Sequence, residues 1–138
     1  MDLTVLDAGV VIAVLDGTDA HHAASVRVVH EAVSRGDRLV LPASAYAECL
    51  VAPCRRGKEA VDTVDAFVDA LPAVVEPITR AIAAQAAELR ARHGTRLRLP
   101  DALVVATALG LKATRVITTD AEWPDLPVPV DLISPARN

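Results

Sequence analysis

Short apolar runs alternate with longer helical patterns along this 138-residue chain, and this alternation restricts the possible folds more than any other feature. Strands of a parallel sheet read as short, mostly apolar runs, and the segments that connect them are usually helical. The expected strands span residues 3–6, 38–41, 74–75, 115–118 and 128–133. The expected helices span residues 9–15, 19–34, 42–52, 56–71, 79–93 and 101–111. The pattern therefore predicts an α/β fold, with helices wrapped around a central parallel sheet.

The ends of these helices are predicted from capping residues and prolines. Asp19 is the expected N-cap of the second helix, and Gly94 is the expected stop of the Ala-rich helix that precedes it. Pro42 suits a first helical turn, and the helix that it opens is expected to stop before Pro53. A chain of this length suits one domain, so we expect residues 1–138 to form a single domain.

Composition excludes some classes of protein. The net charge is −4 and only Tyr46, Phe67 and Trp123 are aromatic, so neither global charge nor base stacking would drive nucleic-acid binding. Cys49 and Cys54 do not form a CxxC motif, and we expect two reduced thiols. The N-terminus lacks a positively charged leader, and the apolar runs fall short of the about 20 residues that span a bilayer. We therefore expect a cytoplasmic protein with no membrane partner.

Four acidic residues stand alone in otherwise apolar stretches: Asp7, Glu48, Asp101 and Asp120. A carboxylate among buried side chains is costly to desolvate unless a cation or hydrogen bonds compensate it. Taken singly, Asp7 is explained as a helix cap, Asp101 as compensation of a helix dipole, and Asp120 as a turn residue. Together they are better explained by one cleft that holds a divalent cation. An all-oxygen ligand set favours Mg²⁺ or Mn²⁺ over zinc.

The positions of the four acids agree with that interpretation. Asp7 and Asp120 directly follow predicted strands, and the functional crevice of an α/β sheet lies at the carboxyl ends of its strands. Glu48 is flanked almost entirely by apolar residues. Its helix is therefore expected to be largely buried, and Glu48 is not expected to be a solvated surface charge.

The segments VLDAGVVIA, LPASAYAECL, LRLPDALVVATAL and VITTDAEW resemble those of PIN domains, specifically VapC-type toxin ribonucleases. The resemblance implies an α/β/α sandwich with a central parallel sheet, and an Mg²⁺- or Mn²⁺-dependent endoribonuclease that hydrolyses RNA through a metal-bound water. It also implies a homodimer that a cognate antitoxin neutralises. Carried over by position, Asp7, Glu48, Asp101 and Asp120 match the catalytic acidic quartet. Asp7, Asp101 and Asp120 would be the metal ligands.

Two positions bear on how well the resemblance holds. PIN domains typically carry Ser, Thr or Asn two residues after the first Asp, where this chain has Gly9, and the missing side chain is expected to weaken metal binding. Thr118 matches a supporting hydroxyl before the fourth acid. Glu122 and Asp125 are alternatives to Asp120.

A basic stretch leads into Asp101 and is the better candidate for contacts to RNA phosphates, which position a substrate without specifying its sequence. Its arginines are Arg90, Arg92, Arg96 and Arg98. They are equally well explained as solvated cations at a helix C-terminus. A second basic cluster spans residues 55–58. The expected substrate is tRNA or rRNA.

Two rival functions remain open. The first is a catalytically impaired PIN-like module that binds RNA or antitoxin without cutting, and Gly9 favours it. The second is a phosphotransfer domain, which needs a second Asp beside Asp7 and a lysine after a strand. Lys112 instead precedes its strand, so this rival is weak. A groove for an antitoxin segment is also conceivable between the helices at residues 20–33 and 61–71, although such apolar faces more often pack on a core.

Overall fold

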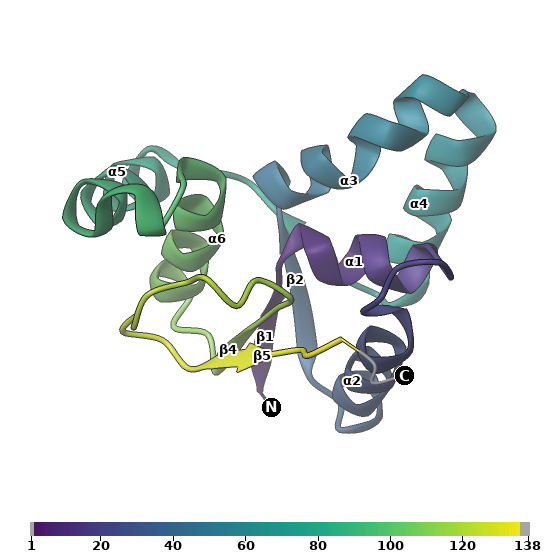
Figure 1. Cartoon of the computed structure of the whole chain (residues 1–138), viewed down its shortest axis with the longest axis horizontal. Coiled ribbons are helices and arrows are strands. Elements are labelled where there is room, and N and C mark those ends of the chain that lie inside the picture. The colour runs from purple at the N-terminus through teal and green to yellow at the C-terminus, as the bar shows by residue number, and fades with distance from the viewer. Residues whose placement is uncertain (1, 136–138) are drawn as a thin grey trace.

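The computed structural model describes residues 2–135, which form six α-helices, one 3₁₀-helix and five strands (Figure 1). The strands are β1 (Leu3–Leu6), β2 (Arg38–Pro42), β3 (Val74–Glu76), β4 (Arg115–Thr118) and β5 (Val130–Leu132). The helices are α1 (Ala8–Leu15), α2 (His22–Ser34), α3 (Ala43–Arg56), α4 (Lys58–Ala70), α5 (Arg80–His93), η1 (Gly94–Arg96) and α6 (Leu99–Gly110). Each predicted strand and helix is present, with ends shifted by a few residues.

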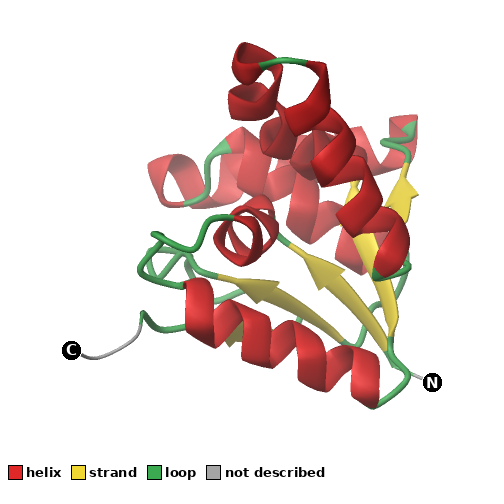
Figure 2. Cartoon of the chain, turned by 90° about the vertical axis from the view of Figure 1, so that its right-hand side faces the viewer, coloured by secondary structure: helices red, strands yellow, loops and turns green. Residues whose placement is uncertain are grey.

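The five strands form one sheet in the order β3-β2-β1-β4-β5, and all neighbouring pairs are parallel. Helices α1–α4 lie on one side of the sheet, and α5 and α6 lie on the other (Figures 1 and 2). The predicted α/β/α sandwich is therefore confirmed. The connections change sides between β1 and β4, so the carboxyl ends of these two strands border the crevice where α/β proteins place their ligands.

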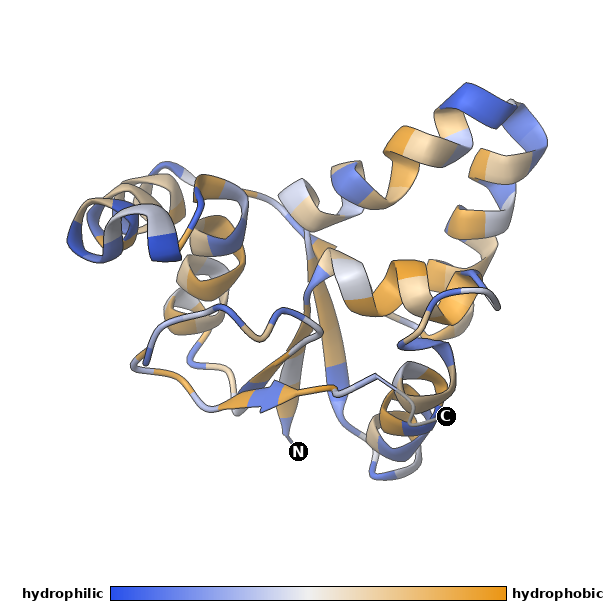
Figure 3. Cartoon of the chain, in the orientation of Figure 1, coloured by the Kyte–Doolittle hydropathy of each residue, from blue (hydrophilic) through white to orange (hydrophobic). Residues whose placement is uncertain are grey.

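The core is built from small aliphatic side chains, as the scarcity of aromatic residues predicts. The central strands β1, β2 and β4 contribute fully buried Val, Leu and Ile residues, and α6 buries six consecutive or nearly consecutive positions between Ala102 and Ala108. A helix that is apolar on nearly all sides must be enclosed. Figure 3 shows these apolar residues on the strands and on the helices that cover them.

Several predicted helix ends are wrong. Helix α3 continues through Pro53 to Arg56, because its buried face runs at four-residue intervals through Ala45, Cys49 and Pro53, and Gly57 (φ 122°) ends it. Packing thus offsets the hydrogen bond that a proline removes from a helix.

Two further corrections concern helix starts. Asp19 does not cap α2, which begins at His22; its carboxylate accepts a hydrogen bond from the His21 N–H (2.8 Å) in the preceding turn. Pro42 is the last residue of β2 and the N-cap of α3 rather than a residue of its first turn. The stop at Gly94 is confirmed, with φ of 61°. Within residues 2–135, no helix has the length and apolar character needed to cross a membrane.

Candidate metal and catalytic site

Asp7 joins the end of β1 to the first turn of α1, and both oxygens of its carboxylate are held. Oδ1 accepts a hydrogen bond from the Ala8 N–H at 2.9 Å, and Oδ2 accepts one from the Thr118 hydroxyl at 2.8 Å. The register of the sheet explains the second contact. Leu6 of β1 pairs with Ile117 of β4, so Asp7 and Thr118, the residues that follow them, are adjacent. Asp7 is only 7% exposed, and burial is the main cause that raises its pKa.

The Thr118 hydroxyl also connects Asp7 to Asp120. It is fully buried and accepts a hydrogen bond from the Asp120 N–H at 3.1 Å while donating to Asp7. Asp120 in turn accepts a bond on Oδ1 from the Glu122 N–H at 2.8 Å. Thr118 therefore fixes both the carboxylate at the end of β1 and the start of the loop that follows β4.

Asp101 lies in the first turn of α6, directly after Pro100, as the sequence predicts. Its carboxyl has a pKa raised to about 6 by burial and by the negative charges of Asp7 and Asp120, against the opposing charge of Arg98. Asp101 and Asp120 line the same open cleft of about 520 Å³. The other residues of this cleft are Thr95, Arg96, Arg98, Ala121, Glu122 and Trp123.

Glu48 is exposed, so the expectation that it is buried is wrong. Helix α3 buries only the face of Ala45, Cys49 and Pro53, and Glu48 lies next to that face rather than in it. Its carboxyl is nevertheless partly covered, and this covering raises its pKa more than the nearby charge of Asp101 does. Glu48 is thus a solvent-accessible carboxylate that still belongs electrostatically to the same group.

We call Asp7, Glu48, Asp101 and Asp120 the acidic group. Each member interacts with at least one other: Asp7 with Glu48 and Asp120, and Asp101 with Glu48, Asp7 and Asp120. Like charges about 4 Å apart repel by about 4 kcal/mol at an effective dielectric constant of 20. A divalent cation would reverse this repulsion, and carboxylate oxygens are the ligands that Mg²⁺ and Mn²⁺ prefer.

The acidic group therefore fits a hard cation in charge and in ligand type. Its side chains do not yet converge, since no three Asp, Glu, His or Cys side chains between residues 2 and 135 are close enough together to hold a metal. The buried Asp7 is fixed by hydrogen bonds, whereas Glu48 is exposed and Asp120 lies on a loop.

The structure separates the basic residues that the sequence groups together. Arg96 and Arg98 line the cleft beside Asp101, but Arg90 and Arg92 on α5 do not. Of the proposed alternatives to Asp120, Glu122 lines the same cleft. Asp125 instead lines an adjoining hollow of about 470 Å³, which also includes Asp120.

Trp123 lines the cleft together with Asp101 and Asp120, a position that its sequence context alone does not predict. Its indole Nε1 is buried and close enough to Asp101 to lower the pKa of that carboxyl, although within residues 2–135 it makes no hydrogen bond of normal length and angle. The sequence feature that indicates a place near the site is the position of this single tryptophan, three residues after Asp120.

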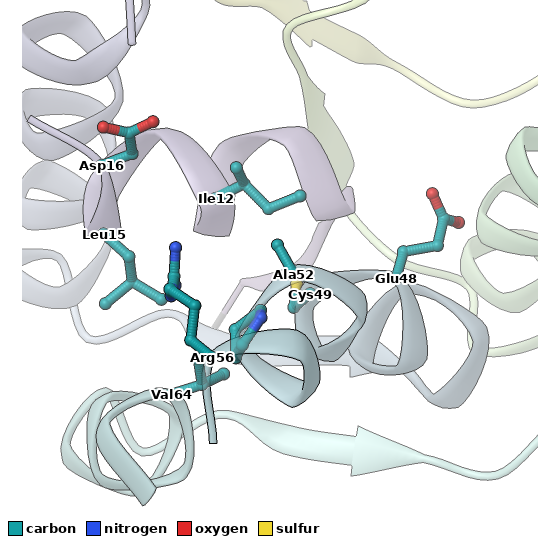
Figure 4. Close-up of a pocket in the computed structure, with 9 residues that line it drawn as sticks. Ile12, Leu15, Asp16, Glu48, Cys49, Ala52, Arg56 and Val64 are labelled. Atoms are coloured by element: carbon teal, nitrogen blue, oxygen red, sulfur yellow. The ribbon is translucent and has the colours of Figure 1, made fainter. Parts of the chain in front are cut away.

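A second pocket, of about 260 Å³, lies between α1, α3 and α4 (Figure 4). Its lining consists of Ile12, Leu15, Asp16, Glu48, Cys49, Ala52, Pro53, Arg56 and Val64. The carboxylate of Glu48 lies at the end of this pocket opposite Asp16 (Figure 4). Glu48 thus contributes to the lining of this pocket, while its carboxylate points away from Ile12 and Cys49 (Figure 4). Because α1 and α3 contribute to this pocket and α2 does not, it differs from the groove considered between the helices at residues 20–33 and 61–71.

Residues 4–129 match the PIN domain family, so this chain belongs to that family, as its motifs predict. No curated protein sequence matches the chain.

Solved structures share the fold. A sarcin–ricin-loop-cleaving toxin, VapC20 of Mycobacterium tuberculosis, is 22% identical with a TM-score of 0.69, over 82% of this chain and 86% of that one. A toxin–antitoxin complex from Klebsiella pneumoniae is 17% identical with a TM-score of 0.73, over 96% of this chain and 99% of that one. VapBC2 from Rickettsia felis, bound to a promoter DNA fragment, is 10% identical with the same TM-score and the same coverage.

Proposed function

We propose that this PIN domain is an Mg²⁺- or Mn²⁺-dependent endoribonuclease and the toxin of a toxin–antitoxin pair. The observation that carries the proposal is the acidic group: four carboxylates from four elements or loops whose charges act on one another at the crevice between β1 and β4. Carboxylates that repel one another beside a cleft, three of them (Asp7, Glu48 and Asp101) with raised pKa values, are typical of functional sites. Membership of the PIN family and the similarity to toxin structures support the same activity.

In this proposal the acidic residues have different roles. When bound, the cation would lower the pKa of a coordinated water and offset negative charge on the scissile phosphate. Asp7, held by Thr118 and the Ala8 N–H, is the rigid ligand, and Asp101 and Asp120 complete the set. Glu48 is exposed and free to reorient, so it positions the attacking water or reaches the cation through water.

RNA would approach through the cleft that contains Arg96 and Arg98. Both arginines are exposed and lie beside Asp101, so a phosphate that they contact is brought close to the acidic group. Arg90 and Arg92 would act only on more distant phosphates. Such contacts make substrate binding dependent on salt and independent of sequence.

The antitoxin is proposed to occupy the pocket between α1, α3 and α4. Ile12 and Leu15 are 39% and 37% exposed at this pocket, and Arg56 adds a positive charge at its wall. A segment with apolar side chains and one acidic residue would fit this lining. Because Glu48 is at one end of the pocket, the bound segment would also restrict Glu48. A homodimer and a cytoplasmic location remain predictions.

The test is cleavage of a mixed tRNA and rRNA pool by purified antitoxin-free protein, with Mg²⁺ or Mn²⁺ and with EDTA. Asp7→Asn and Asp101→Asn are compared with Asp62→Asn, the same change at an exposed ion pair with Lys58 on α4. We expect discrete cuts that require metal, that both site variants lose, and that Asp62→Asn retains. A folded protein that binds RNA or antitoxin without metal-dependent cuts would instead be the impaired binding module.

A further inference from the structure

Gly9, in the first turn of α1, lies unusually close to Thr119. A Cβ atom built on Gly9 would be 2.5 Å from the Thr119 Oγ1, a separation that real Cβ contacts essentially never show. The hydroxyl of Thr119 thus occupies the space into which a side chain at position 9 would project. Any residue other than glycine at this position would require Thr119 to move.

Backbone conformation does not explain this glycine. The residues with positive φ within the described chain are Lys112, Gly36, Gly57 and Gly94, and Gly9 is not among them. Glycine is also a poorer helix former than alanine, so at an ordinary helical position it has no local advantage. The close approach of Thr119 is the physical reason that remains.

The position of Thr119 connects it to the acidic group. It follows Thr118, whose hydroxyl binds Asp7, and it precedes Asp120. Gly9 is two residues after Asp7, so the Thr119 hydroxyl lies over the helical turn that Asp7 caps. Within residues 2–135 the side chain of Thr119 makes no hydrogen bond, whereas that of Thr118 makes two. The Thr119 hydroxyl therefore has no partner within residues 2–135, and it lies beside the first turn of the helix that Asp7 caps, one residue before Asp120.

We propose that Thr119 is a positioning residue for the metal site and supplies, from the end of β4, the hydroxyl that residue 9 lacks. Its hydroxyl donates to a carboxylate of the acidic group or to a water around the cation, and so orders the ligands without binding the metal itself. Gly9 is then a requirement of this arrangement and not a defect. The inference rests on the proposed metal-dependent function.

Metal affinity gives a readout that does not depend on activity. Mn²⁺ is titrated by calorimetry and, in parallel, by the emission of Trp123, the single tryptophan, which lines the cleft with Asp101 and Asp120. Thr119→Val keeps the shape and removes the hydroxyl, whereas Thr119→Ser keeps the hydroxyl. The double variant with Gly9→Ser and Thr119→Ala moves a hydroxyl to residue 9 and removes the obstacle.

Loss of one hydrogen bond corresponds to a weakening of about three- to tenfold in affinity, which we expect for Thr119→Val. The Mn²⁺ affinities of Thr119→Ser and of the double variant should stay within about twofold of the wild-type affinity. The affinity of Thr119→Ala alone should resemble that of Thr119→Val. Gly9→Ala is a second route to the same loss, since its Cβ displaces the hydroxyl without altering residue 119. Melting curves establish that each variant is folded.

The outcomes separate the two proposals. Wild-type affinity in Thr119→Val, or a double variant no better than Thr119→Ala, overturns the role of Thr119 alone, provided that Asp7→Asn abolishes binding. A wild-type protein in which Mn²⁺ produces neither heat nor a change in Trp123 emission overturns the metal site and, with it, this inference.

Discussion

Acidic residues gather at both ends of the parallel sheet, but arginine neutralises only one of the two groups. At the amino end, Arg115 at the start of β4 pairs with Asp2 (2.9 Å), Asp37 (3.0 Å) and Asp131 (3.7 Å). Hydrogen bonds and ion pairs to Arg35, Thr4 and Arg115 hold the pKa of Asp37 below its usual value. At the carboxyl end, burial and mutual repulsion raise the pKa values of Asp7, Glu48 and Asp101.

The two groups of acidic residues differ in the source of the positive charge that neutralises them. The Arg115 cluster, defined as Arg115 with Asp2, Asp37 and Asp131, carries its own cation and is a structural feature. No arginine or lysine side chain neutralises the acidic group as a whole within residues 2–135, and Arg98 only partly offsets the charge of Asp101. Under the proposed function, the cation that neutralises the acidic group comes from solution, and the repulsion between its carboxylates lowers the stability of the metal-free protein.

The largest expected effect is on activity at the carboxyl end. Asp101→Asn should reduce metal-dependent RNA cleavage by about 100-fold or more, because it removes a charged ligand while keeping the shape of the side chain. Initial rates at saturating Mn²⁺ measure the effect. The matched change at the other end, Asp37→Asn, should leave the rate per folded molecule intact. Equal losses in both variants would contradict the division of roles.

The second prediction breaks the Arg115 cluster. Arg115→Met removes the cation from three carboxylates while preserving the aliphatic stem, and should lower the free energy of unfolding by about 2 kcal/mol, since Asp37 is left with Arg35 and Thr4. Urea denaturation at pH 7 gives this value. Mn²⁺ affinity of the folded variant should remain that of the wild type, because the cluster lies at the opposite end of the sheet.

The sequence predicts the position of Asp7 and Thr118 better than that of Glu48, for a physical reason. In a parallel sheet the ends of adjacent strands are set by register, so acids that follow β1 and β4 must lie at one edge. Pro100 likewise places Asp101 in the first turn of α6. Periodicity alone, in contrast, cannot show how much of an apolar helix is covered, and Glu48 on α3 is exposed.

Contacts between segments that are far apart in the sequence cannot be predicted from the sequence alone either. The residues next to Gly9 in the sequence do not indicate that the Thr119 hydroxyl occupies the space beside it, so the sequence alone predicts only that the missing side chain weakens metal binding. The same holds for the basic stretch, where η1 turns Arg96 and Arg98 into the cleft and leaves Arg90 and Arg92 on α5. Packing of distant elements decides these positions.

Metal binding should reverse the unfavourable electrostatics of the acidic group. A ligand that binds only the folded state at ten times its Kd stabilises that state by about 1.4 kcal/mol. We therefore expect Mn²⁺ to raise the melting temperature and EDTA to cancel the rise. Asp7→Asn should abolish the shift, whereas Arg115→Met should melt earlier but show the same shift. A rise of equal size in Asp7→Asn would place the metal elsewhere.

The smallest predicted effect is the response of the metal-free protein to pH. The pKa of Asp101 is raised from 3.8 to about 6 in the folded state, so the folded protein binds more protons than the unfolded chain between these values. Stability from this group therefore increases as the pH falls from above 6 towards 4, opposite to the usual behaviour of a carboxylate. Since Asp101 is only half-buried, solvent screening limits the gain to about 1 kcal/mol.

The contribution of Asp37 to stability has the opposite pH dependence. Because the pKa of Asp37 is lowered in the folded state, this contribution is lost only when the pH falls below 3.8 towards the folded pKa. Urea denaturation in EDTA between pH 8 and pH 4.5, about the range over which Asp101 titrates, isolates the acidic group. Asp101→Asn should flatten the increase in the free energy of unfolding as the pH falls, and Asp37→Asn should leave this increase unchanged. A rise that persists in Asp101→Asn would assign it to Asp7 or Glu48, whose pKa values are also raised.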